Sequence, residues 1–162
     1  MKVYGVTGWK DAGKTTLIER LVSELTERGY SISTVKHAHH AADVDHPGRD
    51  SHRHRHAGAG EVLLSSPTRW ALMHELRGAP EPALPELLAR LSPADLVLVE
   101  GFKREPHPKI ECRREAMGKM HHEDDPSVRA IAADGPVKTT LPVFALDDAK
   151  GIADFILADL GL

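Results

Sequence analysis

The sequence predicts an α/β fold, in which a mostly parallel β-sheet is flanked by helices. One observation is the apolar segment at residues 2–7, typical of a strand, followed by residues 14–28 with apolar side chains at helical spacing. Another is the run Leu-Val-Leu-Val at residues 96–99, which indicates a strand buried on both faces of a parallel sheet. Strands that alternate with helices along the chain favour this class over an all-β or all-α fold.

The remaining elements follow from the same periodicities. Further strands are predicted at residues 31–35, 109–113, 128–133 and 141–146. Residues 80–91 contain three prolines and then a helical pattern from Leu84 to Leu91, and a closing helix is predicted after Asp147, which we expect to cap it. The polar segment 36–60 separates the second strand from residues 61–65 and 69–73 and contains a helical stretch at 50–57. The last two strands, joined by Ser-Pro-Thr, predict a β-hairpin extension.

Composition restricts the function. The 162 residues, of which 41% are hydrophobic, suit one soluble domain that spans residues 1–162. A net charge of −3 argues against a nucleic-acid partner bound through bulk positive charge, and no apolar run is long enough to cross a membrane. The lone cysteine, Cys112, excludes an internal disulfide and fits a cytoplasmic location.

Residues 8–15, Gly-Trp-Lys-Asp-Ala-Gly-Lys-Thr, match the phosphate-binding P-loop pattern G-x-x-x-x-G-K-[ST]. They lie between a strand and a helix, so that loop N–H groups and the helix N-terminus can face an anion. Lys14 is expected to contact the β- and γ-phosphates, and Thr15 to ligate Mg²⁺. The predicted phosphate-binding residues are Gly8, Lys10, Asp11, Ala12, Gly13, Lys14, Thr15 and Thr16.

A second predicted metal ligand is Glu100, which follows the buried strand at residues 96–99. An acid at the carboxyl end of such a strand can hold Mg²⁺ directly or through water. Asp95 begins the same strand, and a parallel sheet therefore places it on the edge away from Lys14. Asp45, in the polar segment, is a third candidate ligand, although a solvated loop carboxylate is an equally good interpretation of it.

Seven histidines lie between His37 and His56. The groups at 37–40 and 52–56 are dense enough to bind a transition metal. The segment lacks paired cysteines, so a closed sulfur-rich zinc site is unsupported. Its arginines, Arg49 among them, could instead face phosphates or the acidic surface of a partner. Cys112 is interpreted as a strand residue rather than a nucleophile.

Three stretches together resemble one family, the molybdopterin-guanine dinucleotide biosynthesis adaptor (MobB) proteins. They are GWKDAGKTTLIERL, VKHAHHAADVDHPGRDSHRHRHAGA and DLVLVEGFKREPHPKIE. The closing PVFALDDAKGIADFI is similar in character, so the resemblance covers nearly the whole chain. The histidine-rich segment with PGRDS and the VEGFK motif are more specific than the P-loop.

The resemblance implies a small homodimeric P-loop protein that binds GTP and Mg²⁺ and is at most a slow GTPase. Its implied partner is the molybdenum cofactor guanylyltransferase, which joins GMP to molybdopterin, and molybdopterin is a further implied ligand. By position, His37 and Arg49 are implied to lie near phosphate or molybdopterin, and Glu100 near the metal. No catalytic residue is assigned.

The base that the chain reads is left open by its motifs. The Asn/Thr-Lys-x-Asp pattern that often reads guanine is absent, and residues 145–148, Ala-Leu-Asp-Asp, are a weak substitute after a late strand. GTP therefore comes from the resemblance alone. Two alternatives are a histidine-rich metal-delivery GTPase and a small-molecule P-loop kinase, and fold analogy cannot decide among them.

Overall fold

The computed structural model of the protein describes residues 1–38, 43–115 and 123–162. The chain forms two compact units, one from Met1–His37 and Leu88–Leu162, the other from Ala38–Leu87. Each unit is described by itself. Within the described residues, no helix has both the length and the apolar character needed to span a bilayer.

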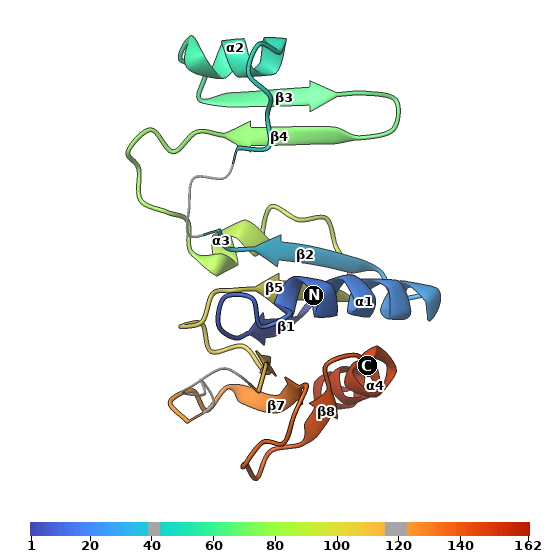
Figure 1. The fold of residues 1–162 in the computed structure, drawn as a ribbon. Coiled ribbons are helices and arrows are strands. Elements are labelled where there is room, and N and C mark those ends of the chain that lie inside the picture. Colours follow the sequence, from blue (N-terminus) through green and yellow to red (C-terminus); the bar gives the residue numbers. More distant parts are fainter. Residues whose placement is uncertain (39–42, 116–122) are drawn as a thin grey trace. The chain divides into compact units, whose positions relative to one another are not determined.

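The first unit contains a six-stranded parallel sheet (Figure 1). Its strands are β1 (Lys2–Thr7), β2 (Ile32–Lys36), β5 (Leu96–Glu100), β6 (Lys109–Arg113), β7 (Val128–Ala133) and β8 (Val143–Ala145). Their order is β2-β5-β1-β6-β7-β8, so β1 lies between β5 and β6. Because all pairs are parallel, the loops after β1, β2, β5, β7 and β8 emerge at one edge of the sheet.

Two helices, α1 (Lys14–Glu27) and α4 (Ala149–Leu160), pack against each other and on the sheet (Figure 1). Their buried residues recur at helical spacing, as the sequence predicted: Leu17, Leu21 and Leu25 on α1, Ile152 and Ile156 on α4. Burying one such side chain contributes about 1.5–3 kcal/mol. This aliphatic packing fixes the N-terminus of α1 directly beyond β1.

The strand β5 confirms the prediction of a segment buried on both faces. Residues 96–99 are all 0% exposed, and β1 and β2 cover the two sides of the strand. The strand ends at Glu100, whose side chain retains 12% exposure. The α/β class with a mostly parallel sheet flanked by helices is therefore confirmed.

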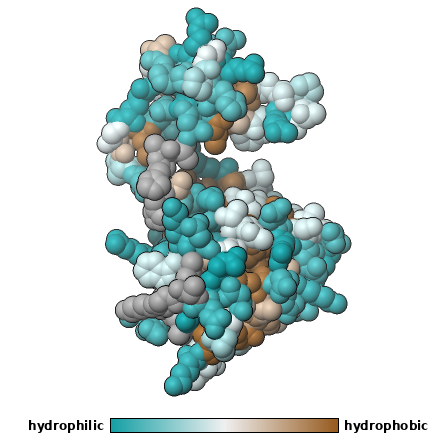
Figure 2. Space-filling view, in the orientation of Figure 1, coloured by the Kyte–Doolittle hydropathy of each residue, from teal (hydrophilic) through white to brown (hydrophobic). Residues whose placement is uncertain are grey.

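The second unit confirms the β-hairpin extension. Strands β3 (Glu61–Ser65) and β4 (Trp70–His74) pair antiparallel, with Leu63 opposite Leu72. Helix α2 (Asp50–His56) packs against β3. Hydrophilic residues predominate on the molecular face drawn in Figure 2, with smaller hydrophobic areas.

Two predicted details of the helices are wrong. The helical pattern expected from Leu84 to Leu91 ends earlier than predicted, since α3 begins at Leu84 but spans only Leu84–Leu88. The N-cap of α4 is Asp148 rather than Asp147, because the Asp148 carboxylate accepts the N–H of Gly151 at 2.9 Å. An N-cap side chain accepts the N–H three residues further along the chain, as Asp148 does here, and Asp147 therefore lies one position before the N-cap.

Candidate functional site

The loop between β1 and α1 has the backbone of an anion cradle. Gly8 has a φ of 139°, and a Cβ there would lie 2.5 Å from the Cys112 carbonyl oxygen. Only glycine allows that approach. Helix α1 begins after Gly13 with no side-chain cap and no acidic residue in its first turn. The first N–H groups of the helix therefore remain available to an anion.

A cavity of about 420 Å³ lies at this loop. It is lined by Lys10, Asp11, Gly13, Lys14, Thr15, Thr16, Lys36, Glu100 and Arg114. The side chain of Ala12, by contrast, is packed in the core, and Gly8 lies against Cys112. Lys14 donates from Nζ to the Trp9 carbonyl oxygen at 2.6 Å. The structure thus gathers six of the eight predicted phosphate-binding residues around one cavity.

Thr15 and Glu100 both line this cavity and are in contact with each other. The Thr15 hydroxyl lies 3.2 Å from both oxygens of the Glu100 carboxylate. Lys36 Nζ lies 3.3 Å from Thr15 Oγ1 and 3.2 Å from Glu100 Oε2. Two of the three residues predicted as metal ligands, 85 positions apart in the sequence, are therefore neighbours because β1 and β5 are adjacent parallel strands.

Asp95 lies at the other end of β5, as expected. Its carboxylate accepts the hydroxyl and the N–H of Ser31, at 2.6 and 2.8 Å. These hydrogen bonds hold the pKa of Asp95 below its ordinary value. Asp95 thus joins β5 to the start of β2 and is structural.

The donor set at Thr15 and Glu100 fits Mg²⁺. Mg²⁺ prefers oxygen ligands and is commonly held by one or two protein groups together with phosphates and water. Here one hydroxyl and one carboxylate lie in contact, and the Lys36 ammonium already places a positive charge beside both. The Lys36 side chain is 58% exposed, so it can move aside for a metal ion.

Three further cations surround the loop, and we did not predict them from the sequence. Lys36 reaches the site from the end of β2. Arg114 donates from Nε to the Asp11 carbonyl oxygen at 3.2 Å. Lys103 Nζ lies 5.2 Å from the centre of the Trp9 ring. Burial and the nearby Lys14 lower the pKa of Lys103. The end-of-strand rule that located Glu100 would also have located Lys36.

His37 is placed beside this site through the VEGFK motif. Its N–H donates to the Glu100 carbonyl oxygen at 2.9 Å, and its ring lies 4.8 Å from the Phe102 ring centre. A Cβ on Gly101 would lie 2.8 Å from the His37 Cβ. His37 is not among the residues that line the cavity. Its predicted ligand role remains a prediction.

Asp45 and Arg49 lie in the second unit, so their predicted contacts with metal and phosphate also remain predictions. Asp45 accepts hydrogen bonds from the Ser51 hydroxyl at 2.9 Å and from Arg55 Nη1 at 3.3 Å. Arg55 also donates to Asp43 at 2.8 Å and, from Nε, to Glu75 at 2.6 Å. The hydrogen bond from Arg55 lowers the pKa of Asp43 to about 2. These charges stabilise the second unit itself.

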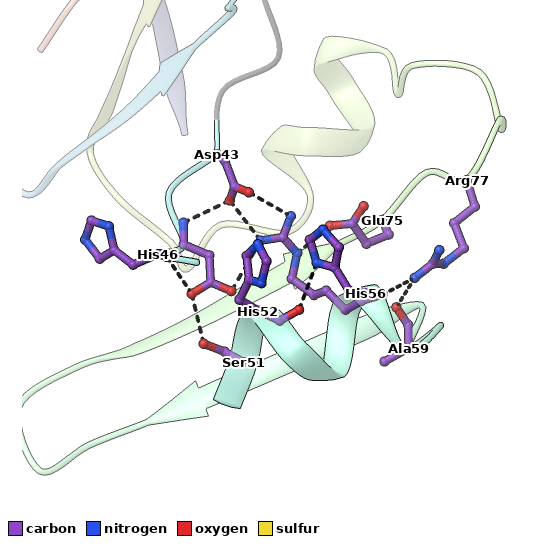
Figure 3. Close-up of polar contacts among 10 residues, drawn as sticks. Asp43, His46, Ser51, His52, His56, Ala59, Glu75 and Arg77 are labelled. Atoms are coloured by element: carbon purple, nitrogen blue, oxygen red, sulfur yellow. Dashed lines mark hydrogen bonds and ion pairs between the residues drawn. The ribbon is translucent and has the colours of Figure 1, made fainter. Parts of the chain in front are cut away.

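The histidine-rich stretch is only partly described, because His39 and His40 lie outside the described residues. His52 and His56 stack with ring centres 3.9 Å apart (Figure 3). No group of three or more potential metal ligands from His, Cys, Asp and Glu occurs in residues 1–38, 43–115 and 123–162. Cys112 is buried in β6, which raises the pKa of its thiol to about 12, as fits a strand residue.

A second cavity, of about 390 Å³, adjoins the first. It lies at the ends of β7 and β8 and shares Gly13, Thr16 and Arg114 with the phosphate cavity. Its other lining residues are Arg20, Ala133, Asp134, Ala145, Leu146 and Asp147. A ligand whose phosphates lie in the first cavity can therefore extend into the second.

Sequence comparison identifies related proteins. The family model described as Molybdopterin guanine dinucleotide synthesis protein B (MobB) matches residues 3–134. A Haemophilus influenzae protein named molybdopterin-guanine dinucleotide biosynthesis adapter protein is 42% identical over 157 residues, covering 95% of this chain and 86% of that protein. The Escherichia coli protein of the same name is 40% identical over 153 residues, covering 92% and 87%.

Solved structures agree with the sequence comparison. Bacillus subtilis MobB superposes with a TM-score of 0.77 at 27% identity, covering 99% of this chain and 98% of that one. The structure of a molybdopterin-guanine biosynthesis protein B gives a TM-score of 0.78 at 27% identity, covering 98% and 99%. The chain therefore belongs to the MobB family of P-loop adapter proteins of molybdopterin-guanine dinucleotide biosynthesis.

Proposed function

We propose that the protein binds GTP with Mg²⁺ and acts as the adapter of the guanylyltransferase that attaches GMP to molybdopterin. The observation that carries the proposal is the cavity where Lys14, Thr15 and Glu100 converge beyond β1. The biosynthetic pathway in the proposal, that of molybdopterin-guanine dinucleotide, is taken from the names of the protein's relatives. Nucleotide binding and partner assistance are the two parts of the proposal.

In this proposal the loop N–H groups and Lys14 hold the β- and γ-phosphates. Lys14 now donates to a main-chain carbonyl and can exchange that bond for a phosphate oxygen, which gives a stronger charge-assisted contact. Thr15 and Glu100 would hold Mg²⁺, which supplies charge neutralisation on the phosphates. Lys36 and Lys103 add positive charge around the same loop.

Hydrolysis in this proposal is slow. Phosphoryl transfer requires an oriented water and stabilisation of the transition-state charge. Among the described residues, the carboxylates that line the phosphate cavity are those of Asp11 and Glu100, and the proposal assigns Glu100 to the metal. A partner that contributes a charged group would accelerate the step. The protein is thus an adapter that is a weak GTPase at most.

The proposed assembly is a cytoplasmic homodimer that meets the guanylyltransferase. The hairpin leaves large apolar side chains exposed, with Leu63 at 61%, Trp70 at 64% and Leu72 at 43%. Exposed apolar groups of this kind mark interaction surfaces. Molybdopterin is a further proposed ligand, with His37 and Arg49 as its candidate contacts. Sedimentation equilibrium measures the oligomeric state, and a monomer at micromolar concentration would rule out the dimer.

Reconstitution tests the adapter role. The yield of molybdopterin-guanine dinucleotide is measured with the guanylyltransferase at limiting substrate, with and without this protein and GTP. We expect a higher yield with the wild-type protein and no increase with Thr15→Ala, which removes the hydroxyl at the metal. A yield that the wild-type protein leaves unchanged would refute the adapter role.

A further inference from the structure

The cavity beyond β7 and β8 contains three carboxylates in or beside it, and they differ in what they already bind. Asp134 accepts the N–H of Glu115 through Oδ1 at 2.7 Å and Arg114 Nη1 through Oδ2 at 3.3 Å. Asp148 caps α4 through the N–H of Gly151. Both carboxylates therefore already accept hydrogen bonds from within the protein.

Asp147 is different. No hydrogen bond or ion pair joins its carboxylate to any residue in the described parts of the chain, and it lines the cavity. Its main chain is fixed, since the Asp147 carbonyl accepts the N–H of Ala149 at 2.9 Å and the Asp148 N–H bonds to Ala145 at 3.1 Å. A carboxylate on a fixed backbone that faces a cavity can accept two hydrogen bonds from one ligand.

The cavity also has the surroundings of a nucleoside base. Leu146 lies against the phosphate loop, because a Cβ on Gly13 would be 3.7 Å from Leu146 Cδ2. Leu146 and Ala145 give the cavity an apolar side on which a flat ring can pack. Arg114 ties the loop to the cavity through the Asp11 carbonyl and Asp134, and so fixes the boundary between phosphates and base.

We propose that Asp147 reads the nucleotide base and selects guanine, a role that rests on the proposed nucleotide binding. Guanine presents two adjacent donors, N1–H and the 2-amino group, which one carboxylate can accept together. Adenine presents one amino donor beside the N1 acceptor, and that acceptor would face the negative carboxylate. The contact therefore favours guanine and disfavours adenine. It replaces the base-reading motif that is absent from the sequence.

The test replaces one hydrogen-bond acceptor of the Asp147 carboxylate by the donor NH₂ group of an asparagine. Calorimetric titrations with Mg²⁺ and GTP, ATP, inosine triphosphate or xanthosine triphosphate compare the wild-type protein with Asp147→Asn. We expect Asp147→Asn to bind GTP about tenfold more weakly or worse, on the scale of a hydrogen bond to a charged group. The same variant should gain affinity for xanthosine triphosphate, because its amide can donate to the 2-carbonyl oxygen of xanthine and accept from N1–H.

Asp148→Asn is the matched control. It makes the same chemical change one residue away, and asparagine caps a helix about as well as aspartate. We expect its nucleotide affinities to equal those of the wild-type protein. Inosine triphosphate tests the contact in the wild-type protein itself. It differs from GTP only in lacking the 2-amino group, and the wild-type protein should bind it several-fold more weakly than GTP.

The outcomes separate this inference from the proposed function. GTP preference in the wild-type protein with unchanged GTP affinity in Asp147→Asn would overturn the role of Asp147 and leave nucleotide binding intact. Equal affinity for GTP and inosine triphosphate would also overturn it. Failure of the wild-type protein to bind any triphosphate would overturn both.

Discussion

Gly101 is the residue whose replacement most directly tests how the site is held. Its φ is 95°, and an added Cβ would lie 2.8 Å from the Cβ of His37. Gly29, after α1, has a φ of 93° and no atom within 4 Å of an added Cβ. The two positions therefore share the backbone strain but differ in the steric clash.

The magnitudes follow from these two terms. A side chain at either left-handed position costs about 1–2 kcal/mol. The clash at Gly101 involves a Cβ, which cannot rotate away, and overpacking of this kind costs about 1–3 kcal/mol more. We expect Gly29→Ala to lower the free energy of unfolding by about 1–2 kcal/mol and Gly101→Ala by about 2–5 kcal/mol.

Urea denaturation followed by far-UV circular dichroism measures both losses, and calorimetry measures GTP affinity. His37 donates its N–H to the Glu100 carbonyl, so a displaced His37 shifts the ends of β2 and β5. We therefore expect Gly101→Ala, and not Gly29→Ala, to weaken GTP binding. Equal losses of stability, within about 0.5 kcal/mol, would refute the claim that close packing of His37 on Gly101 holds the site.

Two further predictions concern charge and pH. Glu100→Gln is expected to weaken Mg²⁺-dependent GTP binding about tenfold or more, because it removes the charged metal ligand. Asp95→Asn makes the same change at the other end of β5 and should leave GTP binding unchanged. Titration calorimetry at several Mg²⁺ concentrations checks this, and equal effects of the two variants would contradict it. Burial lowers the pKa of His107 to about 4, from an ordinary value of 6.5. Between these two pH values the unfolded chain binds a proton at His107 that the folded chain does not. The free energy of unfolding should therefore fall as the pH drops from about 6.5 toward 4. Over that range the free energy of unfolding of the wild-type protein should fall by roughly 3 kcal/mol, and His107→Gln should remove this loss. Urea denaturation at a series of pH values measures both proteins, and the same pH dependence in the two would contradict the prediction.

The elements that carry strong local signals were predictable from the sequence. The glycine pattern between a strand and a helix located the phosphate cradle, and four consecutive apolar residues located β5. Parallel pairing then required Glu100, not Asp95, to share an edge with Thr15, and the structure shows this. These inferences needed only periodicity and strand direction.

The residues that were missed depend on strand order. Arg114 and Asp134 reach the site only because β6 lies beside β1 and β7 lies beside β6 in the sheet, an arrangement that no local pattern specifies. The choice of Asp148 over Asp147 as helix cap depends on one residue of register, which composition does not determine. Likewise, the ion pair between Asp45 and Arg55 forms only once α2 is folded.

Calorimetric titration of the protein with GTP and ATP in the presence of Mg²⁺, beside Lys14→Ala, tests the central claim most directly. Lys14 is the cation placed to exchange its bond with the Trp9 carbonyl for a phosphate oxygen. Nucleotide binding predicts saturable GTP binding, tighter than ATP binding, that Lys14→Ala weakens by about 1.5–3 kcal/mol. GTP affinity that is unchanged in Lys14→Ala, or no heat of binding in the wild-type protein, would contradict it.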